Sequence, residues 1–279
     1  MKTVTTLDEL WAAREQMPRP VGLIPTMGFL HEGHLSLVRR AREECSTVVV
    51  SIFVNPTQFG PSEDLATYPR DLTRDLALLE AAGADLVWTP TVDVMYPPGF
   101  QTFVEVEGVS DGLEGERRPG HFRGVATVVA KLFAAVQPQR AYFGQKDAQQ
   151  AVVISQMARD LSFPVEVVIC PTVREPDGLA MSSRNAYLNR EERAAATVLH
   201  RALTVARTSF DSGSREAETL RQTMASLIDS EPLARLQYVS CADPLTLQEL
   251  DGPVQRALLS MAVFVGKTRL IDNLLLEDV

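Results

Sequence analysis

Two histidines three positions apart follow a short apolar segment, in the stretch PTMGFLHEGH at residues 25–34. The pattern after Gly33 is helical, so His31 and His34 share one helix face beside the positive end of the helix dipole. Exposed backbone N–H groups, two imidazole donors and the room left by Gly28 would together suit a phosphate group. The simpler alternative is an ordinary helix cap. A two-histidine metal site is disfavoured because no third ligand stands at a recognised spacing.

A second set of donors lies in GLAMSSRN, residues 178–185. Ser182, Ser183 and Arg184 stand on a glycine-led loop, and such a loop offers flexible donors to phosphate oxygens. Taken alone, a serine–arginine loop is also typical of a surface turn with a solvated charge. Its meaning therefore depends on the other segments.

A lysine and an aspartate adjoin each other in FGQKDAQQ, residues 143–150, at the end of an expected strand. Lys146 can neutralise a phosphate, and Asp147 can hold Mg²⁺ directly or through water. A plain surface pair at a strand-to-helix turn explains the same pattern about equally well. These residues alone leave both interpretations open.

Basic side chains crowd into ERRPGHFRGV, residues 116–125, which contains Arg117, Arg118, His121 and Arg123. The whole chain has a formal net charge of −9, so an anionic ligand would need a local cluster of this kind. The default interpretation of a charge run is a solvated loop. Contact with a neighbouring subunit is a further alternative.

A long polar loop, NPTQFGPSEDLATYPRD at residues 55–71, follows the second expected strand and carries Gln58, Asp64, Tyr68 and Arg70. Long loops in this position often form the wall of a binding site. We therefore treat the loop as a candidate wall rather than as a simple connection.

The composition excludes several classes of protein. The net charge of −9 disfavours a nucleic-acid scaffold, which needs an extended basic surface. The N-terminus lacks the pattern of a signal peptide, and apolar stretches such as residues 48–54 are too short to cross a bilayer. Cys45, Cys170 and Cys241 form neither a metal spacing nor an even disulfide set. We expect a cytoplasmic protein with no nucleic-acid or membrane partner.

Apolar strands alternate with helices over the first part of the chain. Strands are expected at residues 21–25, 47–54, 85–89, 141–144 and 164–173. Helices are expected after Gly33, near residues 71–82, at residues 125–136 and around residues 147–160. Strands that are apolar on both faces are typical of a parallel sheet covered on both sides. The pattern predicts an α/β fold with a Rossmann-like, doubly wound parallel sheet, whose ligands bind beyond the carboxyl ends of the strands.

The pattern changes in the last third of the chain. Two helices, near residues 190–210 and 214–230, precede a strand at residues 236–244 and a strand pair joined at Gly266–Lys267. This predicts a smaller C-terminal α+β domain at residues 175–279, after a first domain at residues 1–174. His200, in an alanine-rich helix, is expected to be structural.

Taken in order, these segments resemble the pantothenate synthetase (pantoate–β-alanine ligase) family. That family carries IPTMG-x-LH-x-GH, NP-x-QF, RPGHFRGV, FG-x-KD-x-QQ and PT-x-RE-x-DGLAMSSRN, and all five occur here over residues 24–185. The first and last of these also resemble the HIGH and KMSKS motifs of nucleotidyltransferases and class I synthetases. Five motifs in one order are far more specific than a lone HxGH. The last 90 or so residues resemble the family mainly in pattern.

The resemblance implies a reaction in two steps. ATP and (R)-pantoate would give pantoyl-adenylate and pyrophosphate, and β-alanine would then attack the adenylate to give pantothenate and AMP. Mg²⁺ would accompany ATP, with Asp147 as the metal ligand. The protein would be a homodimer built with the first domain, and the smaller domain would close as a lid that keeps water from the adenylate.

The resemblance also assigns residues. ATP would bind Met27, Gly28, Phe29, Leu30, His31, Glu32, Gly33, His34, Gly144, Gln145, Lys146, Asp147, Val173, Met181, Ser182, Ser183 and Arg184. Gln58 and Gln150 match the glutamines that hold pantoate, and Gln58 would also lie near β-alanine. The catalytic set would be His34, His31, Lys146, Ser182 and Arg184, with His34 at the position usually labelled as the proton donor. A carboxylate needs no general base to attack the α-phosphorus, so we expect these residues to act as electrostatic clamps.

Three other functions fit parts of the pattern. A nucleotidyltransferase acting on a phosphorylated precursor would need strong positive charge for the second phosphate, whereas Gln58 and Gln150 suit a neutral hydroxy acid. A fragment of an aminoacyl-tRNA synthetase would need a basic RNA-binding domain. A nucleotide sensor without turnover would not need Lys146, Asp147 and paired histidines together. Pyrophosphate release with both co-substrates would separate an enzyme from a sensor.

Overall fold

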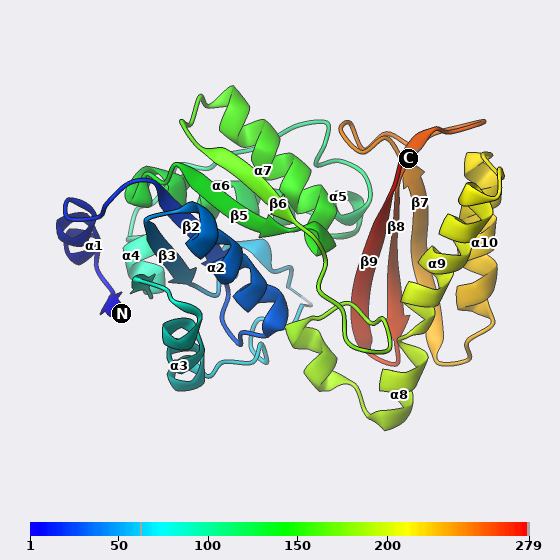
Figure 1. Ribbon diagram of the computed structural model, residues 1–279, viewed down its shortest axis with the longest axis horizontal. Coiled ribbons are helices and arrows are strands. Elements are labelled where there is room, and N and C mark those ends of the chain that lie inside the picture. Colours follow the sequence, from blue (N-terminus) through cyan, green and yellow to red (C-terminus); the bar gives the residue numbers. More distant parts are fainter. Residues whose placement is uncertain (62, 278–279) are drawn as a thin grey trace. The chain divides into compact units, whose positions relative to one another are not determined.

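The computed structural model describes residues 1–61 and 63–277 and divides into two compact units (Figure 1). Unit 1 comprises Met1–Gln145 and Gln150–Pro171, and unit 2 comprises Lys146–Gln149 and Thr172–Val279. The short stretch Lys146–Gln149 thus groups with unit 2, although the chain on either side of it belongs to unit 1.

Unit 1 is built on a six-stranded sheet in which every pairing is parallel. Its strands are β1 (Lys2–Val4), β2 (Val21–Thr26), β3 (Thr47–Ile52), β4 (Leu86–Trp88), β5 (Arg140–Gly144) and β6 (Glu166–Cys170). Their order is β1-β4-β3-β2-β5-β6. The chain proceeds outward in one direction from β2 to β3 and β4, and in the other from β5 to β6, so the winding reverses between β2 and β5. This confirms the predicted doubly wound parallel sheet.

Helices line both faces of the sheet (Figure 1). The helices of this part of the chain are α1 (Leu7–Arg14), α2 (Glu32–Glu44), α3 (Leu72–Ala82), α4 (Val92–Met95), α5 (Glu114–Arg117), α6 (His121–Val136) and α7 (Ala148–Asp160), with 3₁₀ turns η1 (Pro56–Gln58) and η2 (Gln145–Asp147). Consecutive residues of β2 serve different cores: Leu23 packs with residues of α6, and Ile24 packs with residues of α2 and α3. Both side chains are 0% exposed. Burial on alternate faces explains why this strand is apolar throughout.

Local signals fix several helix ends where the sequence predicts them. α3 begins after Asp71, whose side chain accepts the N–H of Arg74, and it ends at Gly83 in the left-handed conformation (φ 87°). α6, in contrast, begins at His121 rather than at residue 125, because the chain turns at Gly120 (φ 79°). The earlier start places His121 in the first turn of the helix.

Unit 2 contains an antiparallel sheet of three strands in the order β7-β8-β9. Its elements are η3 (Ser183–Tyr187), α8 (Arg190–Ala195), α9 (Val198–Asp211), α10 (Ala217–Asp229), β7 (Ala234–Ala242), β8 (Arg256–Val265) and β9 (Thr268–Glu277). Buried residues of α9 and α10, among them Leu199 and Met224, form one core with residues of the sheet such as Met261. This is the predicted α+β arrangement, with β8 and β9 joined by a two-residue turn at Gly266.

Three expectations differ from the structure in detail. The helix expected at residues 190–210 is interrupted between α8 and α9, and the strand expected at residues 164–173 is shorter, at Glu166–Cys170. The N-terminal β1 and α1 were not expected, because a three-residue strand is too short to show a period. Among the described residues, no helix is both long and apolar enough to cross a membrane.

Candidate functional site

Two sets of predicted site residues in unit 1 lie at the ends of neighbouring strands. Met27 to Leu30 form the turn after β2, and His31 to His34 begin α2. Gly144 ends β5, which pairs directly with β2 in the sheet. Gly144 and the turn after β2 therefore lie at the carboxyl edge of the sheet, on the two sides of the point where the winding reverses. This is where open parallel sheets bind their ligands.

The two histidines cap their own helix. The N–H of Gly33 donates to Nδ1 of His31 at 3.2 Å, and the N–H of His31 donates to Nδ1 of His34 at 3.3 Å. The ring centroids are 4.1 Å apart. Because each Nδ1 accepts a hydrogen bond, a neutral ring must have its proton on Nε2. The helix-cap interpretation is thus correct, and in the neutral rings the Nε2 atoms carry the protons.

The backbone of the same turn differs from the expectation of exposed N–H groups. The N–H of Phe29 donates to Oδ2 of Asp75 at 2.7 Å, and the N–H of Leu30 donates to Oδ1 at 2.8 Å. The N–H of Gly28 donates to the hydroxyl of Thr26 at 3.3 Å. The expectation is therefore wrong for these three groups, which are bonded within the protein. None of these three N–H groups is therefore an open donor for a phosphate.

Asp75 holds this turn from the first turn of α3. Its side chain is 1% exposed, and a Cβ added at Gly28 would lie 3.1 Å from its Oδ2. Gly28 and Phe29 both have positive φ, 83° and 51°, a conformation that is strained for phenylalanine. Arg74 donates from Nη1 to the carbonyl of Leu30 at 2.9 Å. The turn is thus fixed by α3 in a shape that its own sequence does not favour.

Gln58 is anchored at both ends of its amide. Asn55, which is 1% exposed, donates from Nδ2 to Oε1 of Gln58 at 3.0 Å and to the carbonyl of Gly124 at 3.1 Å. Nε2 of Gln58 contacts the sulfur of Met27 at 3.2 Å. The structure therefore brings Gln58 next to the turn after β2.

His121 supports the backbone of Gln58. Nη1 of Arg118 lies 3.0 Å from Nε2 of His121, and Nδ1 of His121 lies 2.8 Å from the carbonyl of Gln58. Since arginine can only donate, Nε2 accepts and Nδ1–H donates to the carbonyl. Burial, reinforced by the positive charge of Arg118, lowers the pKa of His121 to about 4. The ring is therefore neutral at physiological pH.

The arginines of the basic cluster have different partners within unit 1. Arg118 donates to both carboxylate oxygens of Glu63, each at 2.7 Å. The guanidinium of Arg123 lies 3.7 Å from the centroid of the Phe103 ring, and Arg117 lies 3.8 Å from Glu116. Arg118 is thus neutralised by Glu63 and supports Gln58 through His121, whereas Arg117 and Arg123 keep their positive charge at the surface of this segment.

The serine–arginine loop lies in unit 2 and is folded back on itself. Arg174 and Ala180 form an antiparallel bridge, and the N–H of Met181 donates to the carbonyl of Val173 at 3.0 Å. Ser182 caps η3, with its hydroxyl accepting the N–H of Arg184 at 3.3 Å. The segment therefore forms the turn that the sequence suggests, in which Ser182, Ser183 and Arg184 have a defined backbone.

Lys146 and Asp147 form the close pair that the sequence predicts. Nζ of Lys146 lies 3.6 Å from Oδ1 of Asp147, and the two side chains are 20% and 48% exposed. Gln145 begins the same 3₁₀ turn, and Gln150 lies half-buried in the first turn of α7. Within residues 1–61 and 63–277, no group of three His, Cys, Asp or Glu side chains could hold a metal ion by itself.

A cavity of about 320 Å³ opens at the carboxyl ends of β2, β3 and β4. Met27, Gly28 and Asp75 line one side of it, and Arg70 from the long polar loop lines another. The loop therefore contributes to a cavity wall, as its position in the sequence predicts.

Sequence reasoning missed Asn55, Asp75, Asp272 and Asn273. Asn55 stands in the NP-x-QF motif, of which only Gln58 was assigned a role. Asp272 and Asn273 form a polar pair inside the apolar strand TRLIDNLLL, and that break in the pattern is a usable signal. Asp75 gives no such signal, because an acidic residue in the first turn of a helix is common.

Comparison with protein families gives a match along almost the whole chain. The family model described as pantoate-beta-alanine ligase matches residues 1–275. The pantothenate synthetase of Herpetosiphon aurantiacus is 64% identical over 277 residues, covering 99% of this chain and 100% of that protein. The pantothenate synthetase of a Roseiflexus species is 63% identical with the same coverage.

Solved structures of pantothenate synthetases are also similar to this chain. Pantothenate synthetase from Thermus thermophilus superposes with a TM-score of 0.94 at 52% identity, covering 98% of this chain and 99% of that one. Pantoate-beta-alanine ligase from Francisella tularensis, complexed with beta-gamma ATP and beta-alanine, gives a TM-score of 0.82 at 35% identity. The shares covered are 99% of this chain and 97% of the Francisella chain.

Proposed function

The chain belongs to the pantoate–β-alanine ligase family, and from this premise we propose that it condenses (R)-pantoate with β-alanine at the expense of ATP, through a pantoyl-adenylate. The observation that carries the proposal is the match of that family over residues 1–275, in a chain whose motifs end neighbouring parallel strands. The products are pantothenate, AMP and pyrophosphate.

In the first step, a carboxylate oxygen of pantoate attacks the α-phosphorus of ATP and pyrophosphate leaves. The attacking group is already an anion, so the barrier lies in alignment and in the build-up of charge on phosphate oxygens. His31 and His34 supply Nε2–H donors, while Lys146, Ser182 and Arg184 supply a cation, a hydroxyl and a guanidinium. Removing one such donor costs about 2.7–4 kcal/mol of barrier by analogy with oxyanion holes.

Gln58 and Gln150 hold the hydroxy acid. The support for Gln58 is its fixed amide, which Asn55 and the backbone contact of His121 keep in one orientation beside Met27. The buried and anchored amide of Gln58 costs little entropy when the substrate binds, because it is already ordered.

In the second step, the neutral amine of β-alanine attacks the acyl carbon and AMP leaves.

Mg²⁺ accompanies ATP. The fit with the residues present is good, because the Asp147 carboxylate is about half exposed and the described part of the chain has no all-protein metal cluster. A magnesium ion that is bound by one carboxylate together with phosphate oxygens and water suits that donor set. When bound, the ion neutralises charge on the phosphates.

Residues 1–174 bind ATP and pantoate, and residues 175–279 act as a lid that keeps water from the adenylate. This division is supported by the boundary between the two compact units, which lies between Pro171 and Thr172.

The protein acts in the cytoplasm as a homodimer built with the first domain. The edge strand β6, with Ile169 38% exposed, offers an uncovered apolar surface for this contact. Light scattering distinguishes the dimer from the 30.7 kDa monomer.

The decisive experiment measures pyrophosphate release from ATP and Mg²⁺ with (R)-pantoate, in the presence and absence of β-alanine. We expect pyrophosphate only when pantoate is present, and AMP with pantothenate only when β-alanine is added. His34→Ala should lower the rate by about 100-fold or more. Folded wild-type protein that releases no pyrophosphate with pantoate would rule out this substrate.

A further inference from the structure

Two of the segments assigned to ATP lie in unit 2, and a single strand contacts both of them. These segments are the Lys146–Gln149 stretch and the loop that carries Ser182 and Arg184. The strand is β9, through its neighbouring residues Asp272 and Asn273. Both side chains are almost completely buried, at 2% and 4% exposure.

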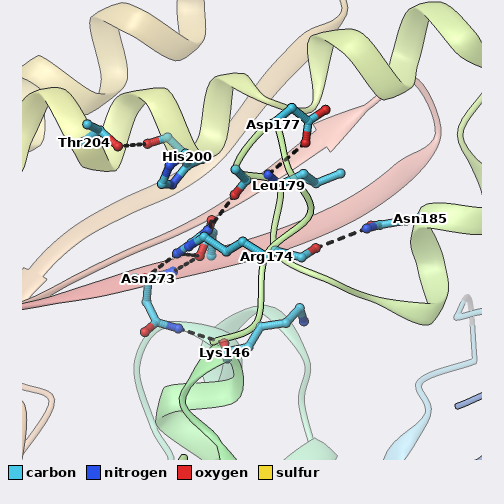
Figure 2. Close-up of polar contacts among 11 residues, drawn as sticks. Lys146, Arg174, Asp177, Leu179, Asn185, His200, Thr204 and Asn273 are labelled. Carbon is cyan, nitrogen blue, oxygen red and sulfur yellow. Dashed lines mark hydrogen bonds and ion pairs between the residues drawn. The ribbon is translucent and has the colours of Figure 1, made fainter. Parts of the chain in front are cut away.

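Asn273 holds the backbone of the catalytic lysine. Its Nδ2 donates to the carbonyl of Lys146 at 2.8 Å, across 127 positions of sequence (Figure 2). The carbonyl belongs to the residue whose Nζ is assigned to the phosphates. A hydrogen bond at this atom restricts the peptide plane from which the lysine side chain extends.

Asp272 holds the base of the serine–arginine loop. Its two carboxylate oxygens accept from Nη1 and Nη2 of Arg174 at 2.7 and 3.0 Å. Arg174 also donates from Nη1 to the carbonyl of Gly178 at 3.0 Å. The N–H of Asn273 donates to Oδ1 of Asp272 at 2.8 Å, which joins the two contacts into one network.

The loop is fixed between Arg174 and Ser182 by further contacts. The N–H of Glu175 donates to the carbonyl of Leu179 at 2.8 Å, and Gly178 turns with a φ of +94°. A Cβ at Gly178 would lie 1.9 Å from Cδ2 of His200, so the turn rests against α9. The expected structural role of His200 therefore includes support for this loop.

A role in stability alone does not explain the buried pair. β9 is otherwise rich in apolar residues, and buried ion pairs often stabilise a protein no better than apolar side chains of similar size. Fully satisfied buried polar networks do, however, select one arrangement of the groups that they join. The groups joined here are the backbones of two proposed ATP-binding segments.

We infer that Asp272 and Asn273 are positioning residues for the adenylation step, fixing Lys146 and the loop that carries Ser182 and Arg184 relative to each other. The inference rests on the proposed function, because it takes these three side chains as phosphate ligands. A misplacement of about 1 Å in such a group can lower a rate by about 100-fold. Neither Asp272 nor Asn273 needs to contact a substrate.

The test compares Asn273→Leu and Asp272→Asn, which keep the approximate size of each side chain, with the wild type. The matched control is Ser260→Ala, since Ser260 pairs with Asn273 in the sheet and its buried hydroxyl has no hydrogen-bond partner among the described residues. We expect pantoate-dependent pyrophosphate release to fall by about 10- to 100-fold in both variants, with the KM for pantoate changed less than about twofold. Ser260→Ala should keep the wild-type rate.

A double-mutant cycle separates positioning from loss of folded protein. Lys146→Ala keeps the carbonyl that Asn273 binds but removes the side chain that it positions. If Asn273 acts through Lys146, Asn273→Leu should slow Lys146→Ala much less than it slows the wild type. If the loss of rate in the double variant equals the product of the losses in Asn273→Leu and Lys146→Ala, the inference is overturned.

Amide hydrogen exchange gives a readout that does not depend on turnover. Asp272→Asn should increase exchange at residues 174–181, where N–H groups bond within the loop, while Ser260→Ala should not. The exchange measurement on Asp272→Asn also remains informative if Asn273→Leu does not fold. A wild type without pantoate-dependent pyrophosphate release would overturn the proposed function. An active wild type whose two variants keep its rates would overturn the positioning role alone.

Discussion

Asp75 supplies the anion for a turn that is shaped to bind one. Consecutive N–H groups near left-handed residues form an anion-binding concavity, and here Gly28 and Phe29 have positive φ. The carboxylate accepts the N–H groups of Phe29 and Leu30 at 2.7 and 2.8 Å. The turn therefore takes its shape from contacts within the protein, and it leads directly into the paired histidines that cap α2.

Asp75→Asn should weaken this turn without changing its size. An amide has one accepting oxygen, so one of the two N–H groups loses its partner, which costs about 1–3 kcal/mol. We expect the free energy of unfolding to fall by that amount and the KM for ATP to rise, as measured by urea titration and pyrophosphate release. Asp71→Asn is the matched control because asparagine also caps helices well. Equal behaviour of the two variants would contradict the role of Asp75.

His121 should make stability depend on pH. Its pKa is about 4 in the folded protein and about 6.5 when unfolded. The unfolded chain therefore binds the proton first, so stability is complete above pH 6.5 and falls as the pH drops toward 4, by up to about 3 kcal/mol. Urea titrations at pH 5 and 7 should show a smaller difference for His121→Gln than for the wild type. An unchanged difference would mean that other groups cause the dependence.

At the scale of elements, α6 and η1 meet at a glycine. A Cβ at Gly124 would lie 2.4 Å from the carbonyl oxygen of Thr57 and 2.7 Å from the nitrogen of Gln58. The close approach lets Asn55 reach the carbonyl of Gly124 at 3.1 Å while it holds the amide of Gln58. The position of a whole helix thus decides where one glutamine side chain lies.

Gly124→Ala should separate the two elements. The added methyl group has no room, so we expect a loss of about 1–3 kcal/mol in the free energy of unfolding. Because η1 carries Gln58, the KM for pantoate should rise more than the KM for ATP. Gly112→Ala is the control, since a Cβ there would meet no atom within 4 Å. A larger effect on ATP than on pantoate would place Gln58 in a different role.

The sequence predicts those features that depend on neighbouring residues. The period of apolar residues gives the alternation of β2, α2 and β3, and Gly83 marks the end of α3. Contacts between distant segments leave little trace. Asp75 reaches Phe29 across 46 positions and Asn273 reaches Lys146 across 127. Arg118 belongs to a cluster that suggests an anionic ligand, because its partner Glu63, 55 positions away, cannot be identified from spacing.

At the scale of the whole molecule, ATP that binds together with Mg²⁺ should stabilise the fold. A ligand present at about 100 times its Kd adds about 2.7 kcal/mol to stability. Thermal unfolding should therefore shift upward with ATP and Mg²⁺ together, and chelation of the metal with EDTA should remove most of the shift. Asp147→Asn should reduce the shift because one carboxylate ligand is lost. A shift that is unaffected by EDTA would exclude Mg²⁺ from nucleotide binding.

The grouping of Lys146–Gln149 with unit 2 has a consequence for chimeric proteins. The chain passes between the units three times, so unit 2 is not one continuous piece of sequence. A chimera in which only residues 172–279 come from a relative would combine the relative's residue at position 273 with Lys146 of this protein. Transfer of residues 146–149 together with residues 172–279 keeps that pair from one parent. Recombination between related genes has to keep the same pair together, because the residues of unit 2 are encoded in two separate stretches of the gene.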